Sequence, residues 1–249
     1  MTIDPVVFLA EVGTEAAPRV FAFPTRTVDE LEDARRAARG DERRALGRDE
    51  AVALMYAADG AEAREARRLR QRAERILDAS GRGNRDASLG AELDFVRLWM
   101  SWRAGSGARA GRLAERFATR HRAAGILTAM AYMVRGEVAF ADEDWDEAVA
   151  RYRFALGQLG TPLYAYALYR TAHVHGRRGE REQGLSTLRE VEQLGCDGSA
   201  ARTTVRVAAA AATELSTGLR QDADGVVRPA SCPVTTGDEP EDTGWHPAE

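Results

Sequence analysis

The side chains that most often carry chemistry are few in this sequence, and they are not clustered. The chain holds four histidines and two cysteines, at His121, His173, His175, His246, Cys196 and Cys232. No Cys-x-x-Cys or mixed Cys/His group supplies the four ligands of a structural zinc site. No His-Glu-x-x-His, Gly-x-Ser-x-Gly or glycine-rich phosphate loop occurs in the structural context that its chemistry needs. The sequence therefore predicts neither a bound metal nor a cofactor, and it does not favour an enzyme.

Lysine is absent, so all 35 basic residues are arginine. A Schiff base or a lysine-containing phosphate loop cannot be built from this composition. His173 and His175 lie two residues apart in an expected helix and so point to different faces, which makes joint metal binding awkward. An acidic cluster lacks the glycine and the spacing of an EF-hand and fits a helix N-terminus better; it comprises Asp142, Glu143, Asp144, Asp146 and Glu147.

Charge is unevenly distributed along the 249 residues, whose net charge is −4. Residues 220–249 hold seven acids, two arginines and four prolines, and they are expected to form a disordered acidic tail. Residues 61–135 hold 16 arginines against eight acids. This excess indicates either solvated helix faces in an arginine-rich composition or a patch that attracts nucleic acid or an anionic surface.

The elements that must position these residues are predicted to be helices. Residues 1–26 are apolar and interrupted by prolines, which favours an extended N-terminal arm. Helix signals begin at Thr27, which with Glu30 fits a capping box. Helix-forming stretches then alternate with breaks near Gly40, Gly60, Gly81 to Gly83, Gly105 to Gly107, Gly125, Gly160 to Pro162, Gly176 to Gly179 and Gly195 to Gly198. No alternating strand pattern lies between them, so residues 27–219 are predicted to be all-α.

A helical unit recurs within this region. In residues 129–160, small residues at Gly136 and Ala148 would let two helices approach, with Glu143-Asp144-Trp145 as the turn and Tyr152 filling the space beside them. The pattern returns 36 residues later, with Ala172, Gly184, Leu188 and Val191 in place of Gly136, Ala148, Tyr152 and Ala155. Such a unit cannot cover its apolar face alone, so the units are expected to stack.

This pattern resembles the tetratricopeptide repeat (TPR), most clearly over residues 129–194. The resemblance implies an α-solenoid of stacked antiparallel helix hairpins. The chain departs from the repeat where the proline arrives late, at Pro162, and where Gly184 replaces an alanine. Residues 161–172 are also similar to a stretch in envelope-associated TPR proteins of myxobacteria and other deltaproteobacteria, some of which act in cell division or gliding motility. The resemblance implies a tryptophan where this chain has His173, and an export signal that is not recognised in this sequence, so the chain departs from the pattern at both points.

The resemblance also implies a concave groove lined by the first helix of each unit. Its residues would be Met130, Met133, Glu137 and Phe140 on the first helix, and Tyr166, Tyr169, His173 and Arg177 on the second. Aromatic, methionine and arginine side chains of this kind are enriched in protein interfaces. Two interpretations stay open: these residues bind a partner, or they pack on a terminal helix formed by residues 200–219.

A second aromatic set lies on an earlier helix. Phe95, Trp99 and Trp102 recur at intervals of four and three residues, so they share one helix face. Such a stripe is typical of a core, and the alternative is an exposed anchor for a partner.

Together these observations favour a non-enzymatic scaffold or adaptor that binds a peptide or helix of another protein in the groove, in a bacterial envelope or motility assembly. The alternative is a binder of nucleic acid or an anionic surface through residues 61–135. The expected location is the cytoplasm, because no signal peptide is recognised, or the periplasm or envelope, because of the resemblance. The sequence identifies neither the partner nor the oligomeric state, and it leaves open whether Cys196 and Cys232 pair.

Overall fold

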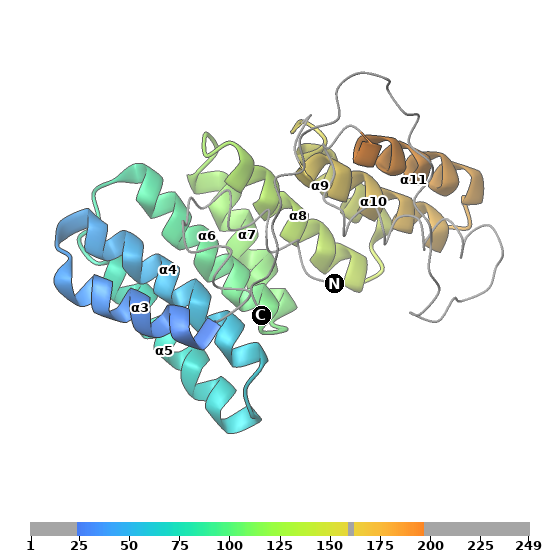
Figure 1. Ribbon diagram of the computed structural model, residues 1–249. Coiled ribbons are helices and arrows are strands. Elements are labelled where there is room, and N and C mark those ends of the chain that lie inside the picture. Colours follow the sequence, from blue (N-terminus) through green and yellow to red (C-terminus); the bar gives the residue numbers. More distant parts are fainter. Residues whose placement is uncertain (1–23, 159–161, 197–249) are drawn as a thin grey trace, which may run out of the picture.

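The computed structural model of the protein describes residues 24–158 and 162–196 (Figure 1). Within them all regular secondary structure is α-helical, which confirms the predicted class. The helices are α3 (Pro24–Ala37), α4 (Gly40–Asp59), α5 (Ala63–Gly81), α6 (Ala87–Arg103), α7 (Gly107–Arg120), α8 (Ile126–Ala141), α9 (Trp145–Ala155), α10 (Pro162–Arg177) and α11 (Arg181–Cys196). Most of the predicted N-terminal arm, the segment 200–219, the acidic tail 220–249 and the side chains of both cysteines lie outside the described residues.

The helices form an elongated array in chain order, from α3 at one end of Figure 1 to α11 at the other. Most helices pack mainly against the helices before and after them, and α4, α6, α8 and α10 also contact one another in succession. One cluster of buried apolar side chains extends through the array, from Val28 on α3 to Val191 on α11. The core is therefore continuous although each part of it is built from neighbouring helices.

Glycine residues mark the helix ends where the sequence predicted breaks. Gly40 and Gly125 begin or precede α4 and α8, and Gly179 lies between α10 and α11. The backbone φ angles of Gly125 and Gly179 are 56° and 77°, a region in which a Cβ atom is unfavourable. The turns at Gly125 and Gly179 therefore favour glycine over other residues.

Two predicted helix boundaries are wrong. Thr27 is not an N-cap, because α3 already begins at Pro24 and Thr27 is buried inside the helix. Proline is favoured in the first helical turn, where its missing N–H is not needed, so the break signal at Pro24 marked a helix start. The last three residues of the predicted arm are consequently helical.

The predicted turn between α8 and α9 is also shifted by one residue. It comprises Asp142 to Asp144, and Trp145 is the first residue of α9. Within this turn, Glu143 has a positive backbone φ angle of 60°, although it is not a glycine. The Asp144 carboxylate accepts a hydrogen bond from the backbone N–H of Glu147 at 3.2 Å, which confirms that the acidic cluster caps a helix.

Small residues bring the helices together as the recurring pattern predicted. A Cβ atom added at Gly136 would clash with the ring of Tyr152, so the tyrosine packs directly on the backbone of α8. Ala148, Tyr152 and Ala155 have no exposed surface. The corresponding positions of the second unit are buried as well, at Ala172, Gly184, Leu188 and Val191.

The same device joins α4 and α5. A Cβ atom at Gly47 would clash with the hydroxyl of Ser80, which is buried and donates a hydrogen bond to the carbonyl oxygen of Ile76 at 2.9 Å. The sequence pattern did not single out this pair. A glycine therefore also permits the close approach of α4 and α5.

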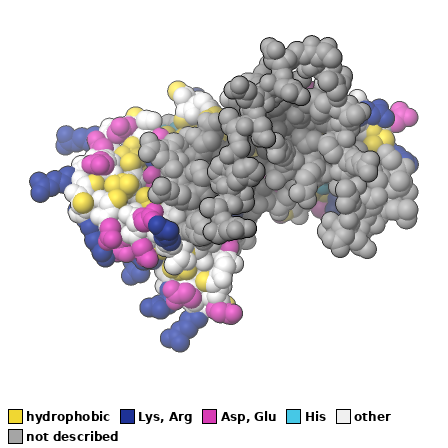
Figure 2. Space-filling view, in the orientation of Figure 1, with side chains coloured by type: hydrophobic (Ala, Val, Ile, Leu, Met, Phe, Trp, Pro, Cys, Tyr) yellow, Lys and Arg dark blue, Asp and Glu magenta, His cyan; other side chains and the backbone are white. Residues whose placement is uncertain are grey.

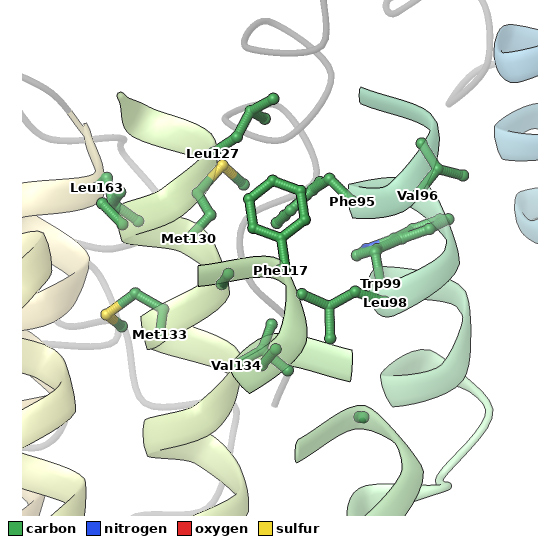
Figure 3. Packing of buried hydrophobic residues seen from close by; sticks show 14 of the residues in the cluster. Phe95, Val96, Leu98, Trp99, Phe117, Leu127, Met130, Met133, Val134 and Leu163 are labelled. Carbon is green, nitrogen blue, oxygen red and sulfur yellow. The ribbon is translucent and has the colours of Figure 1, made fainter. Parts of the chain in front are cut away.

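The aromatic stripe of α6 belongs mainly to the core. Phe95 and Trp99 are fully buried, and Phe95 packs edge-on against Phe117 of α7 with ring centroids 5.8 Å apart (Figure 3). Trp102 is partly exposed and packs against the same cluster. The packing interpretation is confirmed for the first two residues.

Arginines and acids alternate on the described surface of α3 to α5 (Figure 2). Eight of the sixteen arginines in residues 61–135 form ion pairs with carboxylates, and these are Arg68, Arg70, Arg72, Arg97, Arg103, Arg109, Arg120 and Arg135. The positive charge predicted from the sequence is thus partly neutralised. Among the described helices, none combines the length and the apolar character needed to cross a membrane.

Candidate functional site

The predicted groove residues lie on two helices that touch each other, α8 and α10. Steps of three or four residues place each set of four on one face of its helix. Met130, Met133, Glu137 and Phe140 come from α8, and Tyr166, Tyr169, His173 and Arg177 come from α10. We call this the α8–α10 face.

The two methionines are part of the core. Met130 and Met133 have no exposed surface, and Leu163 of α10 lies across from them in Figure 3. The two methionines therefore do not line an open groove, in contrast to the prediction from the sequence. A methionine side chain is flexible enough to fill the irregular space between helices, which accounts for its use here.

A buried ion pair connects α8 with α10. The carboxylate of Glu137 accepts two hydrogen bonds from the guanidinium of Arg170, from Nε at 2.6 Å and from Nη2 at 2.8 Å. The Glu137 side chain is 6% exposed and the Arg170 side chain is 5% exposed. The hydroxyl of Tyr152 on α9 donates a further bond to Glu137 at 3.0 Å. Three helices therefore converge on one carboxylate, whose lone pairs are well satisfied.

Burial and charge act together on the protonation of this network. Burial and then the Glu137 carboxylate raise the pKa of Tyr152 well above its usual range, so the phenol stays protonated and donates. Burial alone would lower the pKa of Arg170, but Glu137, Tyr152 and Tyr166 together outweigh burial, and the pKa is raised. Tyr152 and Arg170 therefore both stay protonated at neutral pH and act as donors to Glu137.

The guanidinium of Arg170 lies against an aromatic ring that belongs to a larger set of ring contacts. Its Cζ atom lies 4.2 Å from the centre of the Phe140 ring, a cation–π distance. Phe140 meets Trp145 edge-on at 5.1 Å between centroids, and Tyr169 meets His173 edge-on at 4.6 Å. These contacts limit the rotamers of the rings and hold them in place on the face.

Two polar atoms on α10 are buried without a hydrogen-bond partner. They are the hydroxyl oxygen of Tyr166 and Nε2 of His173. Burial, followed by repulsion from Arg170 and Arg177, lowers the pKa of His173 to about 4, so the imidazole is neutral at pH 7. Burial and the Glu137 carboxylate raise the pKa of Tyr166 well above its usual range. An unsatisfied buried polar group costs stability, so such groups call for an explanation.

One edge of the face is open. Phe140, Trp145 and His173 are partly exposed and Arg177 is exposed, whereas Tyr166 and Tyr169 are each 4% exposed. Arg177 forms no ion pair with the described residues, unlike its neighbour Arg178, which pairs with Asp146. The accessible chemistry is therefore aromatic and cationic.

The sequence prediction missed Arg170 and the polar role of Tyr152. Arg170 follows Tyr166 by four residues, so helical spacing alone could have placed it on this face. Tyr152 was recognised for its volume only, because its hydroxyl partner lies 15 residues earlier in the chain.

The nearby histidine His175 does not join His173. Its Nδ1 lies 2.6 Å from the Glu180 carboxylate, whereas His173 faces Phe140 and Tyr169. The two side chains point in different directions, as the spacing predicted. In the part of the chain that the structure describes, no three His, Cys, Asp or Glu side chains are grouped as metal ligands.

Within the described residues, the accessible part of this face offers the exposed cation of Arg177 and the partly exposed rings of Phe140, Trp145 and His173. Such a set is suited to binding a chain segment through apolar contact and an ion pair. Comparison with known proteins adds no relative, because no protein-family model, no curated protein and no solved structure matches this chain.

Proposed function

We propose that this protein is a non-enzymatic scaffold that binds a peptide or helix of another protein at the open edge of the α8–α10 face. The observation that carries the proposal is the cluster of Phe140, Trp145, His173 and Arg177, which is accessible yet held on the buried pair of Glu137 with Arg170. Rigid aromatic rings beside an arginine are the side chains that most often anchor protein interfaces.

The chemistry of this edge defines the segment that would fit it. Arg177 has no acidic partner among the described residues, so a carboxylate on the segment would find a free guanidinium. Phe140 and Trp145 would receive an apolar or aromatic side chain. The neutral ring of His173, which is partly exposed, would add a further aromatic contact. We therefore propose an acidic segment that carries an apolar anchor.

The architecture of a TPR-like α-solenoid is part of the same proposal. It is supported by the packing of helices on their chain neighbours and by the successive contacts of α4, α6, α8 and α10. In this arrangement α8 and α10 are the first helices of two stacked units, and α9 and α11 are the second. The similarity of residues 161–172 to envelope-associated repeat proteins supports a role in a bacterial envelope or motility assembly.

Site-specific photo-crosslinking tests the proposed edge. A photoreactive phenylalanine analogue at position 140 should form a covalent adduct with a discrete partner in the native cells. The same analogue at position 154 is the matched control, because Phe154 is an exposed ring on α9, stacked on Tyr132. Position 154 should not form that adduct. The change Arg177→Glu should abolish the adduct at position 140, because it reverses the charge offered to the segment.

Identical adducts from positions 140 and 154, or an adduct that persists in Arg177→Glu, would contradict the proposal. Substitution of Tyr166 and Tyr169 is a poor test, because both are buried and their loss would destabilise the fold.

The arginine-rich residues 61–135 remain the basis of the alternative, a binder of nucleic acid or an anionic surface. Half of their arginines are already paired with acids, so we place this function second. Its mark would be an affinity for duplex DNA or anionic vesicles that falls steeply with salt.

A further inference from the structure

A pocket of about 300 Å³ lies at the opposite end of the array from the α8–α10 face. It is lined by four arginines, Arg35 of α3, Arg43 and Arg44 of α4, and Arg82 directly after α5. Among the residues that the structure describes, none with an acidic side chain lines it. Four arginines, from α3, from α4 and from the residue that follows α5, therefore line one concave site, which distinguishes it from a solvated helix face.

The positive charge of the pocket is only partly compensated. Arg35 donates a hydrogen bond from Nε to Glu50 at 2.5 Å, and Arg44 donates one to Asp41 at 2.6 Å. Arg43 and Arg82 are exposed and form no ion pair within the described residues. Two of the four positive charges thus have no partner in the described part of the chain, and both residues line the pocket.

Backbone geometry adds to this field on one side. Gly40, where α4 begins, also lines the pocket, and no side chain caps that helix N-terminus. The free N–H groups of a helix N-terminus favour an anion. The C-terminal end of α5 has the opposite polarity, but its carbonyl groups are engaged by Ser80, by Arg97 and, just beyond it, by Arg44.

We propose that this arginine pocket binds a phosphate monoester dianion, either free phosphate or the phosphate group of a small metabolite. Two uncompensated guanidinium groups match the two charges of a monoester better than the single charge of a nucleic-acid diester. A volume near 300 Å³ is at the lower limit of small-molecule pockets. Ile76 and Ala79 give the pocket an apolar side that would contact the organic part of such a molecule.

Calorimetric titration of the full chain with inorganic phosphate, at about pH 7.5 and constant ionic strength, tests the site. The double change Arg43→Gln and Arg82→Gln should weaken binding by about tenfold or more, because each lost guanidinium removes a charge-assisted hydrogen bond. Arg112→Gln with Arg116→Gln is the matched control, since these two arginines are exposed on α7 and far from the pocket in sequence. The control should bind phosphate as the unchanged protein does. All positions are exposed, so both variants should keep the same helical circular dichroism and melting temperature.

Lowering the pH to about 5.5 should weaken phosphate binding but not sulfate binding, because only phosphate loses its second charge there. A sugar phosphate that binds more tightly than inorganic phosphate would identify a metabolite as the ligand, and equal binding would identify free phosphate. Two results would overturn the proposal. One is the absence of heat with phosphate and sugar phosphate alike. The other is an equal loss of binding in both double variants, with duplex DNA bound just as well, because diffuse surface charge would then explain the data.

Discussion

At the scale of single residues, the charge pair of Glu137 and Arg170 is the most consequential feature of the molecule. Ion pairs on the surface contribute little, because water already solvates both charges. A buried pair differs because removal of one partner leaves the other charged group without water or a counter-charge. Tyr152 adds a third contact, so the loss of either charge would also disturb the helix contact at Gly136.

The change Arg170→Met should lower the free energy of unfolding by about 3 to 5 kcal/mol, because Glu137 would stay buried without its counter-ion. Urea denaturation followed by circular dichroism measures this. Arg178→Met is the control, because Arg178 pairs with Asp146, whose side chain is 93% exposed, and its loss should cost about 1 kcal/mol or less. Equal losses in the two variants would show that the Glu137 pair is not isolated from solvent.

The stability of the protein should depend on His173 between about pH 6.5 and pH 4. The pKa of His173 is lowered to about 4 in the folded state, while an unfolded histidine keeps a pKa near 6.5. Between these values the unfolded chain binds the proton and the folded chain does not, so stability is fully present above pH 6.5 and is lost as the pH falls. At pH 5 this amounts to about 1 to 2 kcal/mol.

The variant His173→Phe should abolish that part of the pH dependence, because phenylalanine takes up no proton. The measurement is urea denaturation of both proteins at about pH 7 and pH 5. A slope that is unchanged in His173→Phe would assign the titration to other groups.

At the scale of helices, the contacts depend on glycines at points of close approach. Gly136 accommodates the ring of Tyr152, and Gly47 accommodates the hydroxyl of Ser80. In both places one helix uses the absence of a side chain to bring its backbone close to a neighbour. Substitutions at these positions therefore act on helix pairing more than on helix propensity.

A double-mutant cycle on α4 and α5 tests this explanation. Gly47→Ala should destabilise the protein by about 1 to 3 kcal/mol, because its methyl group collides with the Ser80 hydroxyl. Adding Ser80→Ala removes the hydroxyl and should recover much of that loss, although Ser80→Ala alone also gives up a hydrogen bond. Gly60→Ala is the control. Its added methyl group would point into open space, so the free energy of unfolding should change little. Additive effects at positions 47 and 80 would refute the proposed collision.

Helix positions were predictable from the sequence to a useful degree, and their lateral contacts were not. The breaks at Gly125 and Gly179 follow from local backbone chemistry, so sequence alone located them. Pro24 was interpreted as a break although it begins α3, because proline both ends and starts helices. The pairing of Glu137 with Arg170 spans 33 residues and depends on how α8 and α10 lie together, which periodicity does not encode. Burial of Met130 has the same origin, since spacing identifies a face and not what covers it.

At the scale of the whole molecule, a helix in the middle of the array contacts more neighbouring helices than a helix near either end of the described region. In the described part of the chain, α8 contacts α6, α7, α9 and α10, whereas α3 packs mainly on α4 and α11 mainly on α10. Local opening requires loss of only those contacts that an element makes, so stability should vary along the array.

Hydrogen exchange followed by mass spectrometry should therefore show the slowest exchange in α8 and faster exchange in α3 and α11. In Arg170→Met, protection should fall most in α8, α9 and α10, the helices that meet at Glu137. Uniform protection across the described helices would mean that the array opens as one cooperative unit.

The bond between Glu137 and Arg170 also limits which helix pairs could be inserted, deleted or exchanged in this protein. Repeat arrays are often extended or shortened by inserting or deleting a whole unit, because neighbouring units present equivalent apolar surfaces. Here the helix that packs on α8 must place a guanidinium next to Glu137, and α10 does so with Arg170. The position of Glu137 in the second unit is held by His173, 36 residues later, so a copy of α10 in place of α8 would offer no carboxylate. The helix pairs α8–α9 and α10–α11 are therefore not interchangeable, because the bond requires a carboxylate on α8 and a guanidinium on α10.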